Sequence, residues 1–261
     1  MPIHTFNNPG LYSQNNALQY NFTMQLLGKI FIAPESRILD LGCGDGLITN
    51  EVAKIVEEGV VVGTDISNQM ISYANQNYTM QRNLCFYQMD ASKNTFCNEF
   101  DVITSFNCLH WVKNQEAVIK GIVRASQPGA QVILLFSHRK SLYHTVLDKV
   151  CSNNKWGKSF LKYVNPRYFF DLAFYKDLLI KSGLEIIELK EDEMIYHFKT
   201  PSQLKMFFSA SGAQMKLIPY YLRDDFLNDF VTYYKQESQL TVHKEIPVGF
   251  WCLQIIARLP E

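Results

Sequence analysis

The sequence predicts an α/β fold, with a mainly parallel β-sheet, helices on both faces of it, and a smaller helical lid. Three observations predict this fold. Between residues 36 and 137, short apolar runs alternate with helical patterns, which is typical of parallel strands joined by right-handed crossovers. The first apolar run ends in a glycine-rich turn of the form G-x-G-x-G. Beyond residue 137, two further strand patterns enclose two amphipathic helices, which indicates a hairpin with a helical insertion.

The composition is that of a globular chain with no excess of either charge. Its 261 residues fit one α/β domain with an insertion, or one domain plus a cap. A hydrophobic fraction of 47% is enough for a substantial core and argues against disorder. Lys+Arg and Asp+Glu both number 25, so the sequence lacks the basic excess of nucleic-acid binders. We therefore expect no nucleic-acid partner.

The cysteines and the start of the chain indicate the compartment. There is no C-x-x-C pair, so the spacing offers neither a zinc knuckle nor a disulfide framework, and isolated thiols fit a reducing compartment. No basic segment followed by an apolar run opens the chain, and no apolar run approaches the ~18 residues that span a bilayer. We expect a cytoplasmic protein with no metal site and no membrane segment. The six cysteines are Cys43, Cys85, Cys97, Cys108, Cys151 and Cys252.

The N-terminal segment, residues 1–34, is predicted to be helical and to cover the site. After a polar, turn-rich start, apolar residues recur at three- and four-residue spacing from Tyr12 to Phe31. Such a stripe usually marks a packed helix face. If the helix covers the crevice, Tyr12, Gln19 and Tyr20 could line a site there.

The stretch from Ile38 to Gly46 organises the rest of the chain. It reads as a buried strand, a glycine turn and the start of a helix over residues 47–58, which Gly59 would end. Glycine permits a positive φ and lets a ligand approach the backbone. The spacing differs from the dinucleotide motif G-x-G-x-x-G, because Leu47 stands where the last glycine would fall.

Two carboxylates, Asp40 and Asp45, flank this turn. They would repel a pyrophosphate and attract a ligand that carries an ammonium and a sulfonium group. Asp45 also fits a structural role, since an acid near a helix N-terminus is favoured by the helix dipole. The turn therefore favours a cationic ligand over a dinucleotide.

Further strand ends bring polar residues to the same edge of the sheet. Asp65 ends the second predicted strand 19 residues beyond Gly46, about where an acid meets ribose hydroxyls in a βαβ nucleotide unit. Capping of the next helix is the alternative role for this acid. The strand ends at residues 40–46, 65, 90 and 107–111 would share one edge, where ligands bind in open α/β sheets. The predicted strands cover residues 60–65, 84–89, 101–106 and 131–136, with helices over 68–77 and 114–126.

The chain beyond residue 137 completes the sheet and adds the lid. Helical patterns cover residues 143–161 and 169–182, and strand patterns lie within 184–198 and 248–259. The lid occupies about residues 199–247, so the expected organisation is a core over 35–137 and a completing part over 138–261 in one compact domain. Lid aromatics recur at helical spacing and are expected to be mostly core, with a subset that would make the crevice apolar. They are Phe207, Phe208, Tyr220, Tyr221, Phe226 and Phe230.

The motifs resemble those of class I S-adenosylmethionine-dependent methyltransferases. The resemblance covers residues 36–136 and rests on Leu39–Gly46, Asp65, Asp90–Ala91 and Gln127–Ala130. It implies a Rossmann-like fold and the cofactor S-adenosyl-L-methionine, with S-adenosyl-L-homocysteine as product. In such a site Asp40 would face the methionine moiety, Asp65 the ribose hydroxyls and Asp90 the adenine amine. The full set of cofactor contacts expected is Asp40, Gly42, Cys43, Gly44, Asp65, Ile66, Met70, Asp90, Ala91 and Asn107, with Ile66 and Ala91 against the adenine ring.

A narrower resemblance, to juvenile hormone acid methyltransferases, covers nearly the whole chain. Leu11–Gln19, Ser105–Trp111 and Leu134–His138 carry it, and trans-aconitate and malonyl-carrier methyltransferases share the lid more loosely. It implies a seven-stranded sheet with the last strand antiparallel, and O-methylation of a carboxylate that Gln19 and Trp111 contact. The sequence shows few cationic side chains near the site, which argues against a tricarboxylate such as aconitate.

The expected reaction is in-line attack by a carboxylate oxygen on the sulfonium methyl. A carboxylic acid is ionised at neutral pH and needs no strong general base. Gln19 and Trp111 offer N–H donors that hold a carboxylate without neutralising it, although Gln19 could face solvent and Trp111 could be core. His110 completes the candidate catalytic set, with a structural role as the favoured alternative.

Other functions stay open at this point. The nucleophile could instead be another small molecule, a carrier-bound group, or an RNA or protein side chain. The segment after the fourth strand is not the N-P-P-Y type that accompanies methylation of amide nitrogens. An NAD-dependent oxidoreductase or a non-catalytic cofactor-binding protein is the alternative of another class, and the altered glycine spacing and paired acids count against NAD.

Overall fold

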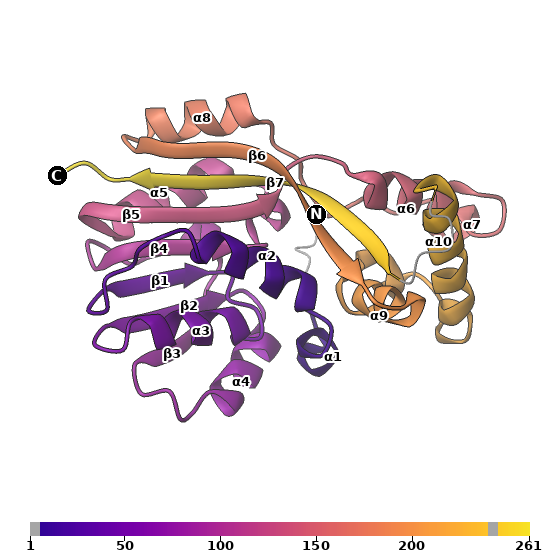
Figure 1. The fold of residues 1–261 in the computed structure, drawn as a ribbon, viewed down its shortest axis with the longest axis horizontal. Coiled ribbons are helices and arrows are strands. Elements are labelled where there is room, and N and C mark those ends of the chain that lie inside the picture. The colour runs from indigo at the N-terminus through magenta and orange to yellow at the C-terminus, as the bar shows by residue number, and fades with distance from the viewer. Residues whose placement is uncertain (1–5, 240–244) are drawn as a thin grey trace.

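The computed structural model describes residues 6–239 and 245–261, and its centre is a seven-stranded sheet (Figure 1). The strand order is β3-β2-β1-β4-β5-β7-β6, and β1 to β5 pair in parallel. β7 pairs antiparallel with both β5 and β6, so the predicted sheet with an antiparallel last strand is confirmed. Among the described helices, none has the length and apolar character to cross a bilayer. The strands are β1 (Arg37–Leu41), β2 (Val60–Asp65), β3 (Leu84–Gln88), β4 (Phe100–Phe106), β5 (Ser126–Ser137), β6 (Glu185–Phe198) and β7 (Ile246–Arg258).

Helices cover both faces of the sheet because neighbouring strand residues point to opposite sides. Ile38 packs on one face with the apolar residues of α2 (Ala17–Leu27) and α3 (Leu47–Ile55). Leu39 packs on the other face with α5 (Gln115–Ala125) and α8 (Leu172–Lys181). α4 (Asn68–Asn77) lies against β2 and β3. The nearly continuous apolar character of β1 follows from this burial on both faces.

A helical cap lies beside the sheet, at the end where β6 and β7 project from it (Figure 1). β5 pairs with β7 only from Ser137↔Cys252 to Gln131↔Arg258, so the first half of β7 pairs with β6 alone as a two-stranded ribbon. The predicted lid is present as α9 (Pro201–Ser211) and α10 (Arg223–Glu237), with the 3₁₀ turns Ala213–Lys216 and Tyr220–Leu222 between them.

Two helices that precede the lid in the sequence join the same cap. These are α6 (Leu142–Ser152), which packs against α10, and α7 (Gly157–Phe160). The ring of Tyr143 lies 5.2 Å from that of Phe230 and 5.0 Å from that of Phe250. The sequence pattern did not predict that α6 and α7 belong to the cap, because their packing depends on the position of the lid at the end of the β6–β7 ribbon.

The aromatic residues of the lid divide between core and surface. Phe208, Phe226 and Phe230 are fully buried, and Phe207 is buried beside the cavities described below. Tyr220 and Tyr221 were expected in the core, but they are exposed on the surface, at 85% and 81%. They belong to a short 3₁₀ turn on the surface rather than to the helix that their spacing predicted.

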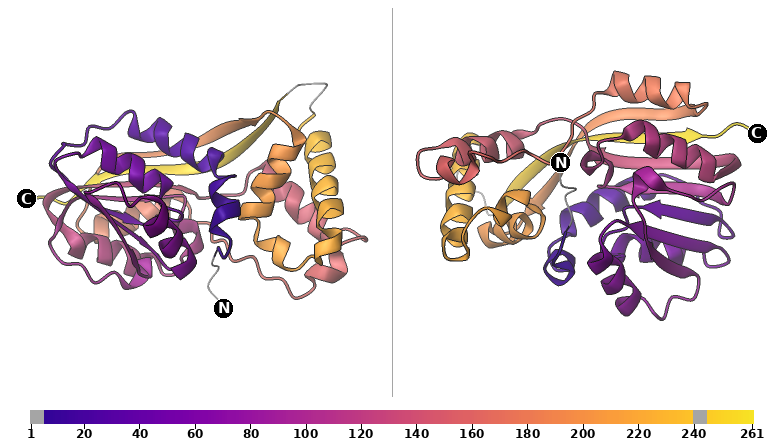
Figure 2. Two further views of the ribbon diagram at one scale, coloured as in Figure 1. Left: turned by 90° about the horizontal axis from the view of Figure 1, so that it is seen from below. Right: turned by 180° about the vertical axis from the view of Figure 1, so that it is seen from behind.

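The predicted continuous helix from Tyr12 to Phe31 is wrong. The chain forms α1 (Pro9–Ser13), whose first turn is capped by Asn8, and then α2. The side-chain amide of Asn15 donates to the carbonyl of Leu11 at 2.8 Å, which competes with helix continuation between the two. α1 therefore lies between the sheet domain and the cap (Figure 2).

Two other predicted helix ends also differ. The helix after the glycine turn ends at Ile55, and Gly59 is not in the left-handed conformation of a helix-ending glycine. Glycine is needed there because a Cβ would lie 2.0 Å from the carbonyl oxygen of Ser36. The helix predicted over residues 143–161 is interrupted after Ser152, where the Asn153 side chain accepts backbone N–H groups that follow it.

Candidate active site

The glycine turn is fastened to the end of β2. The backbone N–H groups of Gly42 and Cys43 both donate to the carbonyl of Thr64, at 2.7 and 2.9 Å. Gly42 has a φ of 81°, and a Cβ on it would lie 2.1 Å from the sulfur of Cys108. Only glycine satisfies both the conformation and the packing at this position.

Asp40 is buried beneath the turn, with 2% of its surface exposed. Its carboxylate accepts hydrogen bonds from the hydroxyls of Thr49 at 2.6 Å and Thr104 at 2.8 Å. Burial raises the pKa of Asp40 to about 6, although these two hydrogen bonds oppose the shift. The hydroxyl groups hold the carboxylate in place without neutralising it.

Two more carboxylates lie at the rim of the turn. Asp65 accepts from the backbone N–H of Ser67 at 2.8 Å and of Gly44 at 3.1 Å, and burial raises its pKa. Asp45 accepts from the side-chain amide of Asn16 at 2.8 Å, and burial raises its pKa to about 6. Asn16 was not foreseen from the sequence, because its role depends on α2 lying over the turn.

These three acids line one cavity of about 570 Å³, part of which is its open mouth. No Lys or Arg is among the residues that line this cavity in the described part of the chain. The Asp65 carboxylate raises the pKa of both Asp40 and Asp45, so the three negative charges are not compensated there. A ligand with positive charge fits such a site, as S-adenosylmethionine does through its ammonium and sulfonium groups. The lining includes the predicted residues Gln19, Asp40, Gly42, Cys43, Gly44, Asp65, Met70, Asn107 and Trp111.

A second cavity, of about 470 Å³ including its open mouth, adjoins the first and shares Phe6, Tyr12, Gln19, Asn107 and Trp111 with it. Its remaining walls combine apolar side chains from α2, the cap and β7 with the polar residues His110, Ser137, Arg167 and Ser211. The predicted catalytic residues Gln19, His110 and Trp111 therefore meet at this cavity. The apolar contribution comes from Leu18, Phe22, Phe207 and Phe250.

Gln19 does not face solvent. It is 9% exposed, and its side-chain oxygen has no hydrogen-bond partner among the described residues. The Asn107 side-chain amide lies 3.5 Å from the Gln19 carbonyl and 3.4 Å from the Thr23 hydroxyl, and so ties β4 to α2. Asn107 has a φ of 56°, an uncommon conformation for a residue other than glycine.

Trp111 lies at the boundary between the cavities rather than in the core. It ends the 3₁₀ turn Leu109–Trp111, and the ring of Phe6 meets it edge-on at 5.7 Å. His110, in the same turn, is 3% exposed, and its carbonyl accepts the N–H of Tyr168 at 2.8 Å. Trp111 lines both cavities and a third one in the cap.

Three residues predicted to bind the adenine moiety are not among those lining the cavities. Asp90 accepts hydrogen bonds from the backbone and hydroxyl of Ser92 at 2.9 and 2.8 Å, as a cap of the turn Ala91–Lys93. Ala91 is buried in the core with α5, and Ile66 is half-buried. Their roles toward the adenine stay predictions. Tyr20 also lies outside the cavities, whereas Tyr12 lines two of them.

The site contains a cation that sequence reasoning missed. Arg167 lines the second and third cavities, and its guanidinium lies 4.6 Å from the centre of the Trp111 ring. The segment that carries it returns from the cap to the sheet and is held by the hydrogen bond from Tyr168 to the carbonyl of His110. The sequence around Arg167 has no periodic pattern, so nothing in it placed this side chain near Trp111.

The chain is similar to known methyltransferases in sequence. Residues 38–129 match a family described as a methyltransferase domain. A protein of Invertebrate iridescent virus 6, named as methyltransferase 235L, is 27% identical over 85% of this chain and 83% of its own length. The juvenile hormone acid O-methyltransferase of Bombyx mori is 26% identical over 86% of this chain and 85% of its own.

Solved structures share the fold. A phosphoethanolamine N-methyltransferase of Haemonchus contortus, solved with phosphomonomethylethanolamine and S-adenosylhomocysteine, superposes with a TM-score of 0.63 at 17% identity. The match covers 98% of this chain and 58% of that one. This structural match supports the fold. The sequence matches and the acid-lined cavity are the observations that favour S-adenosylmethionine as the cofactor.

Proposed function

We propose that this chain, a class I S-adenosylmethionine-dependent methyltransferase, O-methylates the carboxylate of a small, largely apolar acid of isoprenoid or fatty-acid type. The observation that carries the proposal is the position of Gln19. Its buried side chain lines both the acid-lined cavity and the second cavity, and its side-chain oxygen has no hydrogen-bond partner among the described residues. The side-chain NH₂ group of Gln19 would donate a hydrogen bond to a bound carboxylate.

The residues of the first cavity provide for a cationic cofactor. Asp40, Asp45 and Asp65 favour positive charge, and the glycine turn allows close approach of a ligand to the backbone. When bound, S-adenosylmethionine supplies a methyl group on a positively charged sulfur. Transfer breaks the bond from that carbon to sulfur, leaves a neutral thioether and forms a bond from the carbon to the carboxylate oxygen.

The residues of the second cavity position the acceptor. The Gln19 amide and the Trp111 indole are N–H donors that can orient a carboxylate while leaving it charged and nucleophilic. Phe22, Phe207 and Phe250 exclude water around the carboxylate. Loss of part of its hydration shell makes the carboxylate a more reactive nucleophile. No group has to remove a proton, because the acceptor is ionised at neutral pH.

The proposal also draws support from the Bombyx mori relative, whose name states O-methylation of an acid. The test is transfer of labelled methyl from S-adenosylmethionine to isoprenoid acids, fatty acids, aconitate and carrier-bound malonate. We expect a product with an apolar acid that releases labelled methanol in base, as an ester does. A methylated product that survives base would contradict carboxyl methylation and favour an amine or carbon acceptor.

A further inference from the structure

A third cavity continues the acceptor space into the cap. It shares Trp111, Arg167, Phe207, Ser211 and Phe250 with the second cavity and encloses about 460 Å³, including its mouth. Its other walls come from α6, from the segment after α7 and from the turn after α9. An acceptor held at Gln19 could therefore extend past Trp111 into the cap.

Arg167 lines both the second and the third cavity. No carboxylate of the described residues lies within 4.0 Å of its guanidinium. Burial lowers its pKa to about 10, so it stays protonated at neutral pH while it is poorly solvated. The face of the Trp111 ring offsets part of this cost through a cation–π contact.

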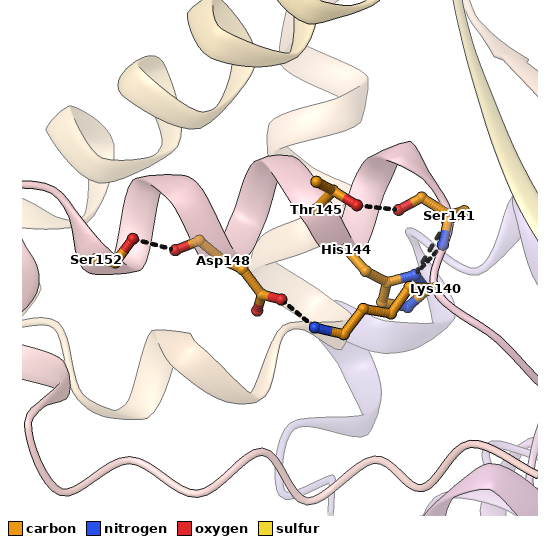
Figure 3. A network of polar contacts seen from close by, with 6 residues as sticks. All are labelled: Lys140, Ser141, His144, Thr145, Asp148 and Ser152. Atoms are coloured by element: carbon orange, nitrogen blue, oxygen red, sulfur yellow. Dashed lines mark hydrogen bonds and ion pairs between the residues drawn. The ribbon is translucent and has the colours of Figure 1, made fainter.

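His144, which also lines the third cavity, carries a second donor. The backbone N–H of Ser141 donates to His144 Nδ1 at 3.1 Å (Figure 3), so Nδ1 carries the lone pair. Burial, with the charges of Arg167 and Lys140, lowers the pKa of His144, and the ring is therefore neutral. The single ring proton must then be on Nε2, which is buried and has no partner among the described residues.

Tyr163 presents the third donor. Its hydroxyl is buried and likewise lacks a partner in the described part of the chain. Arg167, His144 and Tyr163 all line the third cavity. Asp148 is the acid that lines this cavity, and its carboxylate is engaged with Lys140 at 2.6 Å (Figure 3).

We propose that this third cavity is a second acceptor subsite, in which Arg167, His144 and Tyr163 bind a carboxylate at the far end of the methyl acceptor. Two buried donors without acceptors, on His144 and Tyr163, fit a group that only accepts hydrogen bonds. The planar guanidinium fork of Arg167, which has no carboxylate partner among the described residues, matches a carboxylate. Phe207 and Phe250 line both cavities and provide apolar surface for the part of the acceptor between its two ends. The acceptor class is thus a dicarboxylic acid with an apolar middle.

This assignment rests on the proposed carboxyl methylation and specifies its substrate. It also assigns separate tasks to the two ends of the acceptor. The reacting carboxylate at Gln19 keeps its charge and nucleophilicity, whereas the distal carboxylate is the one paired with the arginine. Charge pairing at Arg167 then stabilises the bound acceptor without quenching the nucleophile.

The test compares an α,ω-dicarboxylic acid with the monocarboxylic acid of equal chain length. Binding of each is measured by calorimetry on the S-adenosylhomocysteine complex, and kcat and KM are measured with S-adenosylmethionine. The wild type should bind the diacid about tenfold to a hundredfold more tightly. Arg167→Met should abolish this preference by raising KM for the diacid, and Tyr163→Phe should reduce it by several-fold. Lys162→Met, at an exposed neighbouring cation, should leave the preference unchanged.

Equal binding of the two acids to the wild type would overturn the subsite, and so would an equal loss for both acids in Arg167→Met. If Arg167→Met fails to fold, the comparison of the two acids on the wild type and on Tyr163→Phe still tests the subsite. Arg167-dependent binding of the diacid without ester formation would support the subsite and overturn carboxyl methylation. Ester formation with no preference for the diacid would overturn the subsite alone.

Discussion

The carboxylate of Asp65 accepts a hydrogen bond from the backbone N–H of Gly44 at 3.1 Å, and so joins the end of β2 to the glycine turn. The same carboxylate holds the N–H of Ser67 ahead of α4. A carboxylate has about four acceptor positions, so capacity for ligand hydroxyls remains after these two bonds. Asp65 can therefore shape the cavity and contact the cofactor at once.

Asp65→Ala should weaken S-adenosylhomocysteine binding by about tenfold to a hundredfold, because it removes charged hydrogen bonds and loosens the turn. Calorimetry measures the effect directly. Asp192→Ala is the matched control, since Asp192 forms an exposed pair with Lys190 and should change affinity by less than about twofold. Equal affinities of the Asp65 variant and the wild type would remove Asp65 from the cofactor site.

The pKa values of Asp40 and Asp45, raised to about 6, predict a pH dependence of cofactor binding. Both carboxyls hold a proton more tightly when folded than when unfolded, so without ligand the free energy of unfolding should fall as pH rises from about 4 to about 6. A cationic ligand favours the deprotonated forms. Affinity for S-adenosylmethionine should therefore rise between pH 5 and 7, by up to about tenfold per pH unit for each carboxyl that loses its proton.

S-adenosylhomocysteine is the control for this pH dependence because it lacks the sulfonium charge. Its affinity should change less over the same range, so the ratio of the two affinities should increase with pH. A ratio that is independent of pH would show that the acids do not act on the sulfonium group. Calorimetry in two buffers of different ionisation enthalpy would also detect the expected proton release.

Gly42→Ala should destabilise the chain more than Gly183→Ala does. Both glycines have a φ near +80°, so each alanine variant should lose about 1–2 kcal/mol of unfolding free energy through backbone strain. A Cβ at Gly183 meets nothing within 4 Å, whereas one at Gly42 would collide with Cys108 and add about 1–3 kcal/mol. Urea unfolding compares the two, and equal losses would contradict the packing argument.

Gln19→Ala and Trp111→Ala should lower kcat/KM by about tenfold to a hundredfold while keeping S-adenosylhomocysteine affinity within a few-fold of wild type. Each removes a donor that orients the acceptor. Gln25→Ala is the control on the same helix, since Gln25 is exposed and bonds only to Asn21 among the described residues. Unchanged turnover in both variants would exclude these residues from acceptor binding.

Much of the fold and of the acid-lined cavity could be predicted because those features are local in sequence. The strand before Gly42, the turn and the acid at Asp65 form one βαβ unit whose geometry follows from spacing. Helix breaks were harder, because side chains such as Asn15 and Asn153 bond the backbone and interrupt a helical apolar pattern.

The acceptor side depended on contacts between distant segments. Asn16 reaches Asp45 only because α2 lies over the turn, and Arg167 reaches Trp111 only because the chain returns from the cap to the sheet. Neither contact leaves a periodic or spacing signal. Arg167, the one Lys or Arg that lines these three cavities in the described part of the chain, was not identified from the sequence for this reason.

The central claim is that the methyl group goes to a carboxylate oxygen. The most direct measurement uses S-adenosylmethionine with carbon-13 in its methyl group and follows the enzyme's product by NMR with apolar mono- and dicarboxylic acids. We predict a labelled methyl resonance of a methyl ester, which Gln19→Ala reduces and base converts to methanol. A labelled methyl bound to nitrogen, sulfur or carbon would contradict the claim.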